Sequence, residues 1–538
     1  MLVSILLLII TTSGVFISSG CFVDAENDIK RYLILIPTSI LLLLLTFYKK
    51  TLSKFKKAIE NKTFSYGLVI ICLFLSIQGI LQYLEILKTN NINFAISGSF
   101  ENPAGFAATN SLLFTVSIYQ AIKQSTKKIV RIIIIGISAL AFVTTILSGS
   151  RCGVLAMSTT ILIMLFTETR LKNIIKKHKW IYLLLVLFII GFTLFLYFLK
   201  KDSANGRILI WNICLKMIKE SPFFGYGHNG FRAHYMSFQA EYFMTHDQSA
   251  YSILADNINH PFNEYIKLLV EYGLLCFLLV TLLQVLIIRI ILKQSNAKKG
   301  LGLSLISTIF IMSMFSYPFN YIAFTYIAIL ILILALPIKE LPQKKVYSII
   351  KYIVRIIIIL IASFYIYDCY YNMKWARTYK QSLNGDTKNA LSTYKNLMSK
   401  ISYNPYFLYN YSAELNFVKK YSESNNIAKK YIEKLNDYDV QLLLANNYFN
   451  LQKYDEAIKK YKTASYMVPS RFVPLGNIMN LYLLKSDTIK AVRVAEEILS
   501  KKIKIPSSDI YKIRQEAENL LSNYGKKVEY LKLNCNKQ

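Results

Sequence analysis

Long apolar stretches alternate with short polar segments through the first 370 residues of the chain. Each stretch has about 17 to 25 residues, the length that an α-helix needs to cross the hydrocarbon core of a bilayer. Few charged residues interrupt them, so lipid is the expected surrounding. We therefore predict an all-α, polytopic transmembrane bundle of about eleven helices over residues 1–368. The stretches lie near residues 2–19, 31–48, 64–87, 104–122, 129–148, 152–168, 180–199, 264–288, 301–317, 319–337 and 348–368.

Residues 369–538 follow a different, amphipathic pattern, which predicts a helical repeat domain related to tetratricopeptide (TPR) repeats. One 34-residue unit is clear between Val440 and Pro469, and adding 34 to Tyr448 and Ala457 gives Tyr482 and Ala491. We expect three to four helix pairs. Such repeats commonly hold a protein or peptide, and a purely structural cap is the alternative. The residues that match the unit are Leu444, Ala445, Tyr448, Ala457, Tyr461, Ala464 and Pro469, and Ala390 and Ala428 should open similar second helices.

The net charge of +32 comes largely from lysine and arginine clusters between the apolar stretches. The clusters fall in every second loop, which is the positive-inside pattern of membrane proteins rather than a nucleic-acid surface. We therefore predict a cytoplasmic N-terminus, with the 200–263 loop and the repeat domain outside the cytoplasm. The basic clusters lie at residues 49–62, 123–131, 170–179, 289–299 and 339–345.

The seven cysteines are scattered and include no Cys-x-x-Cys pair, so we expect neither a disulfide framework nor a thiol-bound metal. The first apolar stretch has no basic residue before it and is predicted to be an uncleaved membrane helix.

The 200–263 loop is too long and too aromatic for a simple connection, and it holds four of the five histidines. Residues 207–220 have a helical apolar stripe, with Ser203 and Asn205 as candidate caps and Ser221-Pro222 as the stop. We expect an amphipathic helix on the outer membrane surface. Arg207 and Trp211 would share one face and point a cation at a phosphate, although an ordinary interfacial arginine has the same spacing.

Gly225-Tyr226-Gly227-His228-Asn229-Gly230 matches the Gly-x-Gly-x-x-Gly pattern of dinucleotide sites, but no strand precedes it. We interpret the glycines as turns that bring the backbone close to another part of the protein.

His260-Pro261-Phe262-Asn263 opens the eighth apolar stretch, and Pro261 suits the first helical position. His260 would then lie at a helix N-terminus, where the dipole lowers the pKa of an imidazole and leaves it able to accept a proton. A capping or interfacial histidine is the alternative.

Arg151 follows a tight turn between two apolar stretches, and an arginine there is a functional candidate because its burial is costly. The histidines lack metal-ligand spacing, so we expect metal-independent chemistry.

Three of these stretches, taken in order, resemble the superfamily of O-antigen ligases and polymerases, which are bacterial membrane glycosyltransferases similar to the GT-C class. The match spans roughly residues 100–290. It rests on Ser148-Gly149-Ser150-Arg151, on Gly206-Arg207 with Trp211 and Ser221 to Gly227, and on His260 to Asn263, with support from Asn102 to Ala108 and Val270 to Leu275.

The resemblance implies transfer of a glycan from an undecaprenyl diphosphate carrier to lipid A core, a protein or another glycan, at the outer face of the cytoplasmic membrane. It implies that Arg151 and Arg207 hold the diphosphate and that His260 activates the acceptor hydroxyl. No cofactor or metal is implied, because guanidinium groups can offset the charge on the leaving diphosphate. The candidates for substrate binding are Asn263, Trp211, Gly225, Gly227 and Arg232.

Some residues depart from the family pattern, since Cys152 follows Arg151 where glycine is frequent and Pro261 and Phe262 separate His260 from the asparagine.

Three other functions stay open. A polymerase would need a second lipid-linked site, a glycan transporter would need charges along its helices, and a scaffold would only anchor the repeats. Besides donor and acceptor, we expect membrane lipids and a protein bound by the repeat domain as partners.

Overall fold

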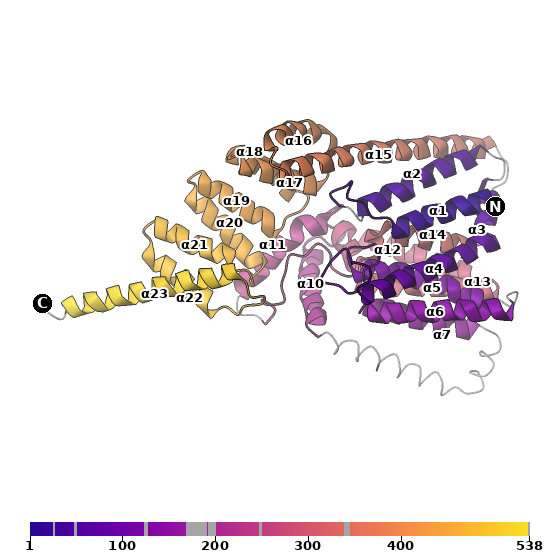
Figure 1. Cartoon of the computed structure of the whole chain (residues 1–538), viewed down its shortest axis with the longest axis horizontal. Coiled ribbons are helices and arrows are strands. Elements are labelled where there is room, and N and C mark those ends of the chain that lie inside the picture. The colour runs from indigo at the N-terminus through magenta and orange to yellow at the C-terminus, as the bar shows by residue number, and fades with distance from the viewer. Residues whose placement is uncertain are drawn as a thin grey trace. The chain divides into compact units, whose positions relative to one another are not determined.

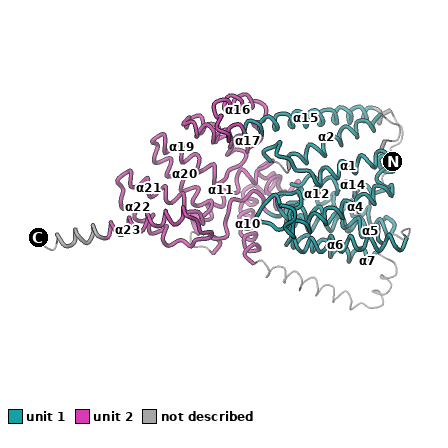
Figure 2. The backbone as a smooth tube through the Cα atoms, viewed as in Figure 1, with its two compact units in different colours: residues 1–196, 262–265, 278–380 teal, residues 197–261, 266–277, 381–538 magenta. Residues whose placement is uncertain are grey.

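The computed structural model describes all residues except 25–26, 48–50, 123–126, 168–190, 192–200, 247–249, 338–344 and 536–538. Within this part the chain is all-helical, with 21 α-helices, one short 3-10 helix and no strand (Figure 1). This confirms the predicted fold class. The chain divides into two compact units (Figure 2): unit 1 is residues 1–196, 262–265 and 278–380, and unit 2 is residues 197–261, 266–277 and 381–538.

Unit 1 is a bundle of apolar helices. Six helices of the described residues are long and apolar enough to cross a membrane, and three shorter apolar helices accompany them in this unit. Ten of the eleven predicted stretches coincide with helices, whereas the stretch at 180–199 and the basic clusters at 170–179 and 339–344 fall largely outside the described residues. The helices are α1 (Leu2–Phe16), α2 (Asn27–Thr46), α3 (Thr51–Glu60), α4 (Lys62–Tyr83), α5 (Pro103–Ile122), α6 (Lys128–Leu147), α7 (Arg151–Thr167), α12 (Glu264–Leu292), α13 (Asn296–Phe315), η1 (Pro318–Asn320), α14 (Ile322–Ala335) and α15 (Lys345–Leu383), α12 being shared between the units.

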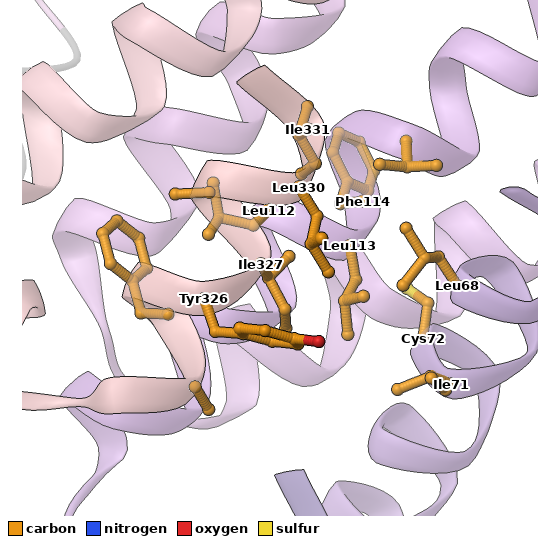
Figure 3. Packing of buried hydrophobic residues seen from close by; sticks show 14 of the residues in the cluster. Leu68, Ile71, Cys72, Leu112, Leu113, Phe114, Tyr326, Ile327, Leu330 and Ile331 are labelled. Atoms are coloured by element: carbon orange, nitrogen blue, oxygen red, sulfur yellow. The ribbon is translucent and has the colours of Figure 1, made fainter. Parts of the chain in front are cut away.

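Helix α5 lies at the centre of the bundle, and most of its residues are buried. Leu112 and Phe114 of α5 pack with Leu68 of α4 and Ile327 of α14 (Figure 3). The amide of Asn110 donates to the carbonyl of Ala141 (3.1 Å) and to the Thr145 hydroxyl (3.1 Å). In lipid, close packing and satisfied polar groups hold helices together, since burial from water contributes little there.

Two polar contacts connect helices of unit 1 that are distant in sequence. Lys298 pairs with Glu60 at 2.8 Å, which joins the first turn of α13 to the end of α3. The Tyr32 hydroxyl donates to the Asp368 carboxylate at 2.8 Å, which joins α2 to α15. Two basic loops that the charge pattern assigns to one side of the membrane, 49–62 and 289–299, therefore meet.

Unit 2 contains a stack of short helices, each of about three to four turns, which has the helix-pair organisation predicted for the repeats (Figure 1). Ala457 and Ala491 take the same place near the start of α20 and α22, and both are fully buried. Ala428 lies one turn further along α18 than predicted, because Ser424 takes the equivalent place. The helices are α10 (Lys201–Glu220), α11 (Gly230–Thr245), α16 (Thr387–Ile401), α17 (Pro405–Phe417), α18 (Tyr421–Ile432), α19 (Tyr438–Asn450), α20 (Tyr454–Met467), α21 (Val473–Leu484), α22 (Thr488–Ser500) and α23 (Ser508–Cys535).

Candidate functional site

Helix α10 confirms most of the prediction for residues 207–220. It ends at Glu220, directly before Ser221-Pro222, and it places Arg207 and Trp211 one turn apart. Its described part already includes Lys201, so the expected caps Ser203 and Asn205 lie inside the helix and that detail was wrong.

Trp211 connects α10 to the segment that carries the candidate histidine. Its indole Nε1 donates a hydrogen bond of 2.9 Å to the carbonyl of Pro261. Trp211 is partly buried, and an indole N–H shielded from water needs such an acceptor, so this contact also fixes the ring. Trp211 therefore orients the backbone next to His260.

The glycine-rich turn pairs with an interruption in α12. Helical geometry breaks at Gly273, where φ is 71° and ψ is −173°. The backbone N–H groups of Tyr226 and Gly227 donate to the carbonyls of Val270 (2.9 Å) and Glu271 (2.8 Å), and Leu274 donates to Pro222 (2.8 Å). The turn thus satisfies backbone groups that the interruption leaves without helical partners.

Two glycines are required by the closeness of this pairing. A Cβ on Gly225 would lie 2.5 Å from the carbonyl oxygen of Val270, and one on Gly273 would lie 2.2 Å from that of Phe223. Gly227 has open space around it but a φ of +81°, which glycine adopts most readily. The turn was expected to approach another part of the protein, and that part is α12. A role of Gly225 or Gly227 in substrate binding stays a prediction.

Arg232 and His260 form the central contact of the site. Arg232 lies in the first turn of α11, 28 residues before the histidine, and its Nη2 is 3.2 Å from Nε2 of His260. An arginine side chain only donates hydrogen bonds, so Nε2 must accept. His260 is therefore the neutral tautomer with its proton on Nδ1.

The surroundings keep His260 uncharged. Desolvation, followed by the nearby Arg232 and Lys267 charges, lowers the pKa of His260 from 6.5 to about 2. The lowered pKa agrees with the prediction, but the predicted cause, the dipole of a helix that starts at Pro261, was wrong. Helix α12 begins at Glu264, so Pro261 is not at the first helical position. Phe262 has a φ of 53°, which keeps this stretch out of the helix. The Asn263 carboxamide instead caps the helix, by accepting from the N–H of Tyr265 at 2.9 Å.

A buried carboxylate completes the cluster. Glu271, one turn after Lys267 on α12, is 3% exposed and accepts a hydrogen bond from the backbone N–H of Phe231. Lys267 and Arg232 both interact electrostatically with it. Arg232 therefore lies near both the His260 imidazole and the Glu271 carboxylate. The sequence signal for Glu271 was the motif from Val270 to Leu275.

Arg151 and Asn263 belong to unit 1, whereas Arg207, Trp211, Gly225, Gly227, Arg232 and His260 belong to unit 2. Arg151 is the first residue of α7 and follows the predicted tight turn, in which Gly149 has a φ of 70°. Asn263 is buried at 4% exposure.

The other described histidines of the loop make separate contacts. His228 Nδ1 is 2.8 Å from the Tyr272 hydroxyl, His234 lies beside Tyr226, and His246 stacks on Tyr242. Across the described residues, no three histidine, cysteine or acidic side chains gather in a way that could hold a metal ion.

The arrangement joins a fixed cation to a neutral proton acceptor. The guanidinium of Arg232 can bind an anion, and a neutral imidazole can accept a proton from a hydroxyl as that hydroxyl forms a new bond. The sequence predicted Arg232 as a substrate contact, but no pattern in it indicated the pairing with His260 or the closeness of Lys267 and Glu271.

Comparison with known proteins gives one family match: residues 136–281 fit the model described as O-antigen ligase. This range contains every candidate residue named above. No curated protein matches the chain.

Two solved structures show weak likenesses to the chain. The MamA RS-1 ArsTM double mutant is 15% identical with a TM-score of 0.22, and the match covers 28% of this chain and 75% of that one. The Cut9-Hcn1 hetero-tetramer of the APC/C is 10% identical with a TM-score of 0.24, over 91% of this chain and 77% of that one. These scores are too low to define a shared fold.

Proposed function

We propose that this bacterial membrane protein transfers a glycan from an undecaprenyl diphosphate carrier to an acceptor at the outer face of the cytoplasmic membrane. The match of residues 136–281 to the O-antigen ligase family and the apolar helices of unit 1 support this proposal. The family match supports glycan transfer in general. The observation that carries the specific proposal is the 3.2 Å contact between Arg232 and the neutral His260 inside the matched region.

In the proposed reaction, the acceptor hydroxyl attacks the anomeric carbon of the donor and the carrier diphosphate leaves with the electron pair of the broken bond. Arg232, with Arg207 and Arg151, would stabilise the negative charge that grows on the diphosphate. His260 would take the proton of the hydroxyl on Nε2. This lone pair now accepts from Arg232, so the guanidinium must turn toward the diphosphate for the imidazole to act. Donor binding would thereby prepare the base.

The arginines also support chemistry without a metal, because two or three guanidinium groups provide the positive charge that a divalent cation would otherwise supply. Transfer should therefore continue in the presence of EDTA.

The test is a transfer assay with purified carrier-linked glycan and an acceptor panel of lipid A core, a protein and a second carrier-linked glycan. We expect His260→Ala and Arg232→Ala each to lower the rate about 100-fold or more. His246→Ala is the matched control, since this exposed histidine of the same loop stacks on Tyr242 and bonds to its neighbours in sequence. Normal transfer by folded His260→Ala and Arg232→Ala variants would reject the proposal, and the acceptor that receives glycan would separate a ligase from a polymerase.

A further inference from the structure

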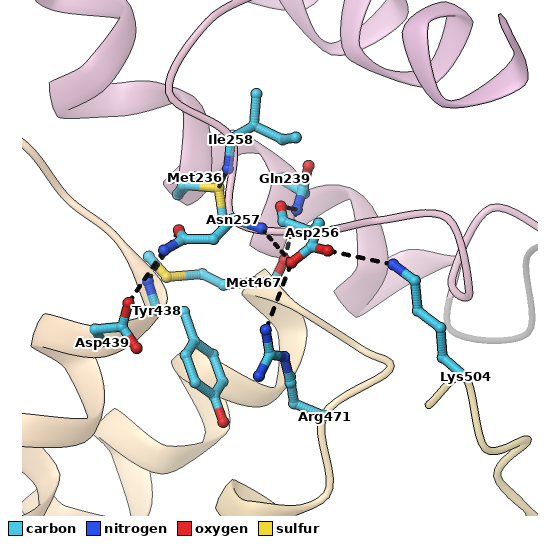
Figure 4. A network of polar contacts seen from close by, with 10 residues as sticks. All are labelled: Met236, Gln239, Asp256, Asn257, Ile258, Tyr438, Asp439, Met467, Arg471 and Lys504. Carbon is cyan, nitrogen blue, oxygen red and sulfur yellow. Dashed lines mark hydrogen bonds and ion pairs between the residues drawn. The ribbon is translucent and has the colours of Figure 1, made fainter. Parts of the chain in front are cut away.

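The segment that carries Arg232 and His260 packs within unit 2 against the repeat helices. Helix α11 lies against α20, and Gln239 of α11 is fully buried in this contact. The Gln239 side-chain amide donates to the carbonyl of Met467 at the end of α20 (2.6 Å) and to that of Asp256 (3.0 Å) (Figure 4). Its side-chain oxygen accepts from the hydroxyl of Tyr235, which lies one turn earlier in α11 (2.8 Å). The two hydrogen bonds that the Gln239 amide donates therefore join α11 to the repeats and to the segment before His260.

A second connection reaches the arginine itself. Asn436, in the loop between α18 and α19, donates from its backbone N–H to the carbonyl of Arg232 at 3.0 Å. Its side-chain amide donates to the Ser237 hydroxyl at 2.9 Å and its carbonyl oxygen accepts from Gln441 at 2.8 Å. Asn436 is 6% exposed, so these bonds are shielded from water. The first turn of α11 is thus held by a repeat loop.

A third connection lies four residues before His260. The Asp256 carboxylate pairs with Lys504 (3.3 Å) and Arg471 (3.8 Å) (Figure 4). The side chain of Asn257 donates to Asp439 at 3.3 Å and accepts from the N–H of Tyr438 at 3.4 Å. The segment leading to His260 is therefore held by residues from three places in the repeat sequence.

We propose that the repeat helices are a positioning element of the transfer site, which holds Arg232 and His260 at bonding distance whatever the acceptor. This inference rests on the proposed function. The two residues come from separate segments of a long loop, and fixing such segments has an entropic cost that contacts must offset. A displacement of about 1 Å can lower a rate about 100-fold. Supporting contacts of the kind made by Asn436 and Asp256 therefore affect the chemical step.

Charge reversal of the partly exposed Asp256 pairs tests this in the full-length chain. We expect Asp256→Arg alone, and Arg471→Asp with Lys504→Asp, each to lower kcat about tenfold for every acceptor, with little change in the acceptor KM. Combining all three substitutions restores attraction between the segments and should recover most of the rate. Recovery separates positioning from a general loss of folding, which thermal unfolding of each variant monitors.

The matched control is Asp455→Arg, which reverses one member of an exposed pair with Lys485 that lies within the repeats and does not involve α11. It should leave transfer unchanged. If the single-side variants keep a normal kcat while His260→Ala is inactive, the positioning role is wrong and the proposed function stands. A change confined to KM for one acceptor would likewise overturn it, in favour of acceptor capture. If His260→Ala is also fully active, the proposed function itself fails.

Discussion

The protonation state of His260 follows from its neighbours at the residue scale. Arg232 can only donate, so Nε2 accepts, and Lys267 adds a second positive charge nearby. Both cations disfavour an imidazolium. The ring therefore remains a weak base, which accepts a proton only once the acceptor oxygen begins to bond to the anomeric carbon and becomes acidic.

This arrangement predicts the pH dependence of transfer. With a pKa of about 2 in the folded protein against 6.5 for the ordinary group, His260 is neutral in the native state throughout the physiological range. We expect kcat/KM to show no acid limb near pH 6.5 that depends on this residue, in a profile measured between about pH 5 and 8.

The same two pKa values of His260 determine how the stability of the folded protein changes with pH. Below pH 6.5 the unfolded chain binds a proton at this position and the folded chain does not, so the contribution of His260 favours unfolding in acid and disappears above pH 6.5. His260→Gln should therefore reduce the loss of stability between pH 7 and 5. If kcat/KM of the wild type falls below pH 6.5 and this fall is absent from the variant, the pKa of His260 is close to its ordinary value and the prediction is wrong.

At the scale of elements, the interruption of α12 is what positions the glycine-rich turn. A continuous helix would use the carbonyl groups of Val270 and Glu271 for its own hydrogen bonds. The positive φ at Gly273 releases them, and Tyr226 and Gly227 bond to them instead. Glu271 and Lys267 consequently lie on a short helical piece beside Arg232.

Gly273→Ala should destabilise this interruption. The new Cβ would meet the Phe223 carbonyl at 2.2 Å in a backbone conformation that alanine rarely adopts. We expect a loss of about 3 kcal/mol in unfolding free energy and a large loss of transfer, measured by thermal unfolding in detergent and by the transfer assay.

Gly136→Ala serves as the comparison, because a Cβ there meets nothing within 4 Å and the residue lies inside α6. It should be neutral or slightly stabilising. Wild-type stability and activity in Gly273→Ala would mean that the interruption is dispensable.

At the scale of the whole molecule, the positive-inside pattern predicts which side of the membrane each loop faces. The contact between Lys298 and Glu60 brings together two basic clusters, 49–62 and 289–299, that this pattern assigns to the cytoplasm. The N-terminal loop that contains Cys21 is assigned to the other side.

Cysteine labelling in right-side-out vesicles tests the assignment. A variant in which the exposed Cys21 is the sole cysteine should react with a membrane-impermeant maleimide. A variant whose sole cysteine is Ala297→Cys, in the basic loop, should react only after the membrane is opened. The opposite labelling would reverse the orientation and remove the proposed outer site.

The sequence alone determined the helical class, ten described helices of the membrane bundle and the repeat register, because each depends on a local property. An apolar stretch of about 20 residues predicts a helix that crosses the membrane. The spacing of small and aromatic residues within 34 positions predicts a pair of repeat helices. Ala457 and Ala491 show this, since both are buried at equivalent places. The helix start at Pro261 was wrong, because the positive φ of Phe262 depends on its tertiary surroundings.

Only the tertiary structure decided which distant residues meet. Arg232 and His260 are 28 residues apart, Asn436 lies about two hundred residues from the arginine that it supports, and Gly225 faces the interruption at Gly273. No periodicity connects such positions. These contacts form because folding brings polar groups from distant parts of the chain together. A buried polar group without a hydrogen-bond partner costs free energy, so such groups pair with one another. The helices could therefore be predicted from local pattern, whereas the pairing of guanidinium with imidazole required the fold.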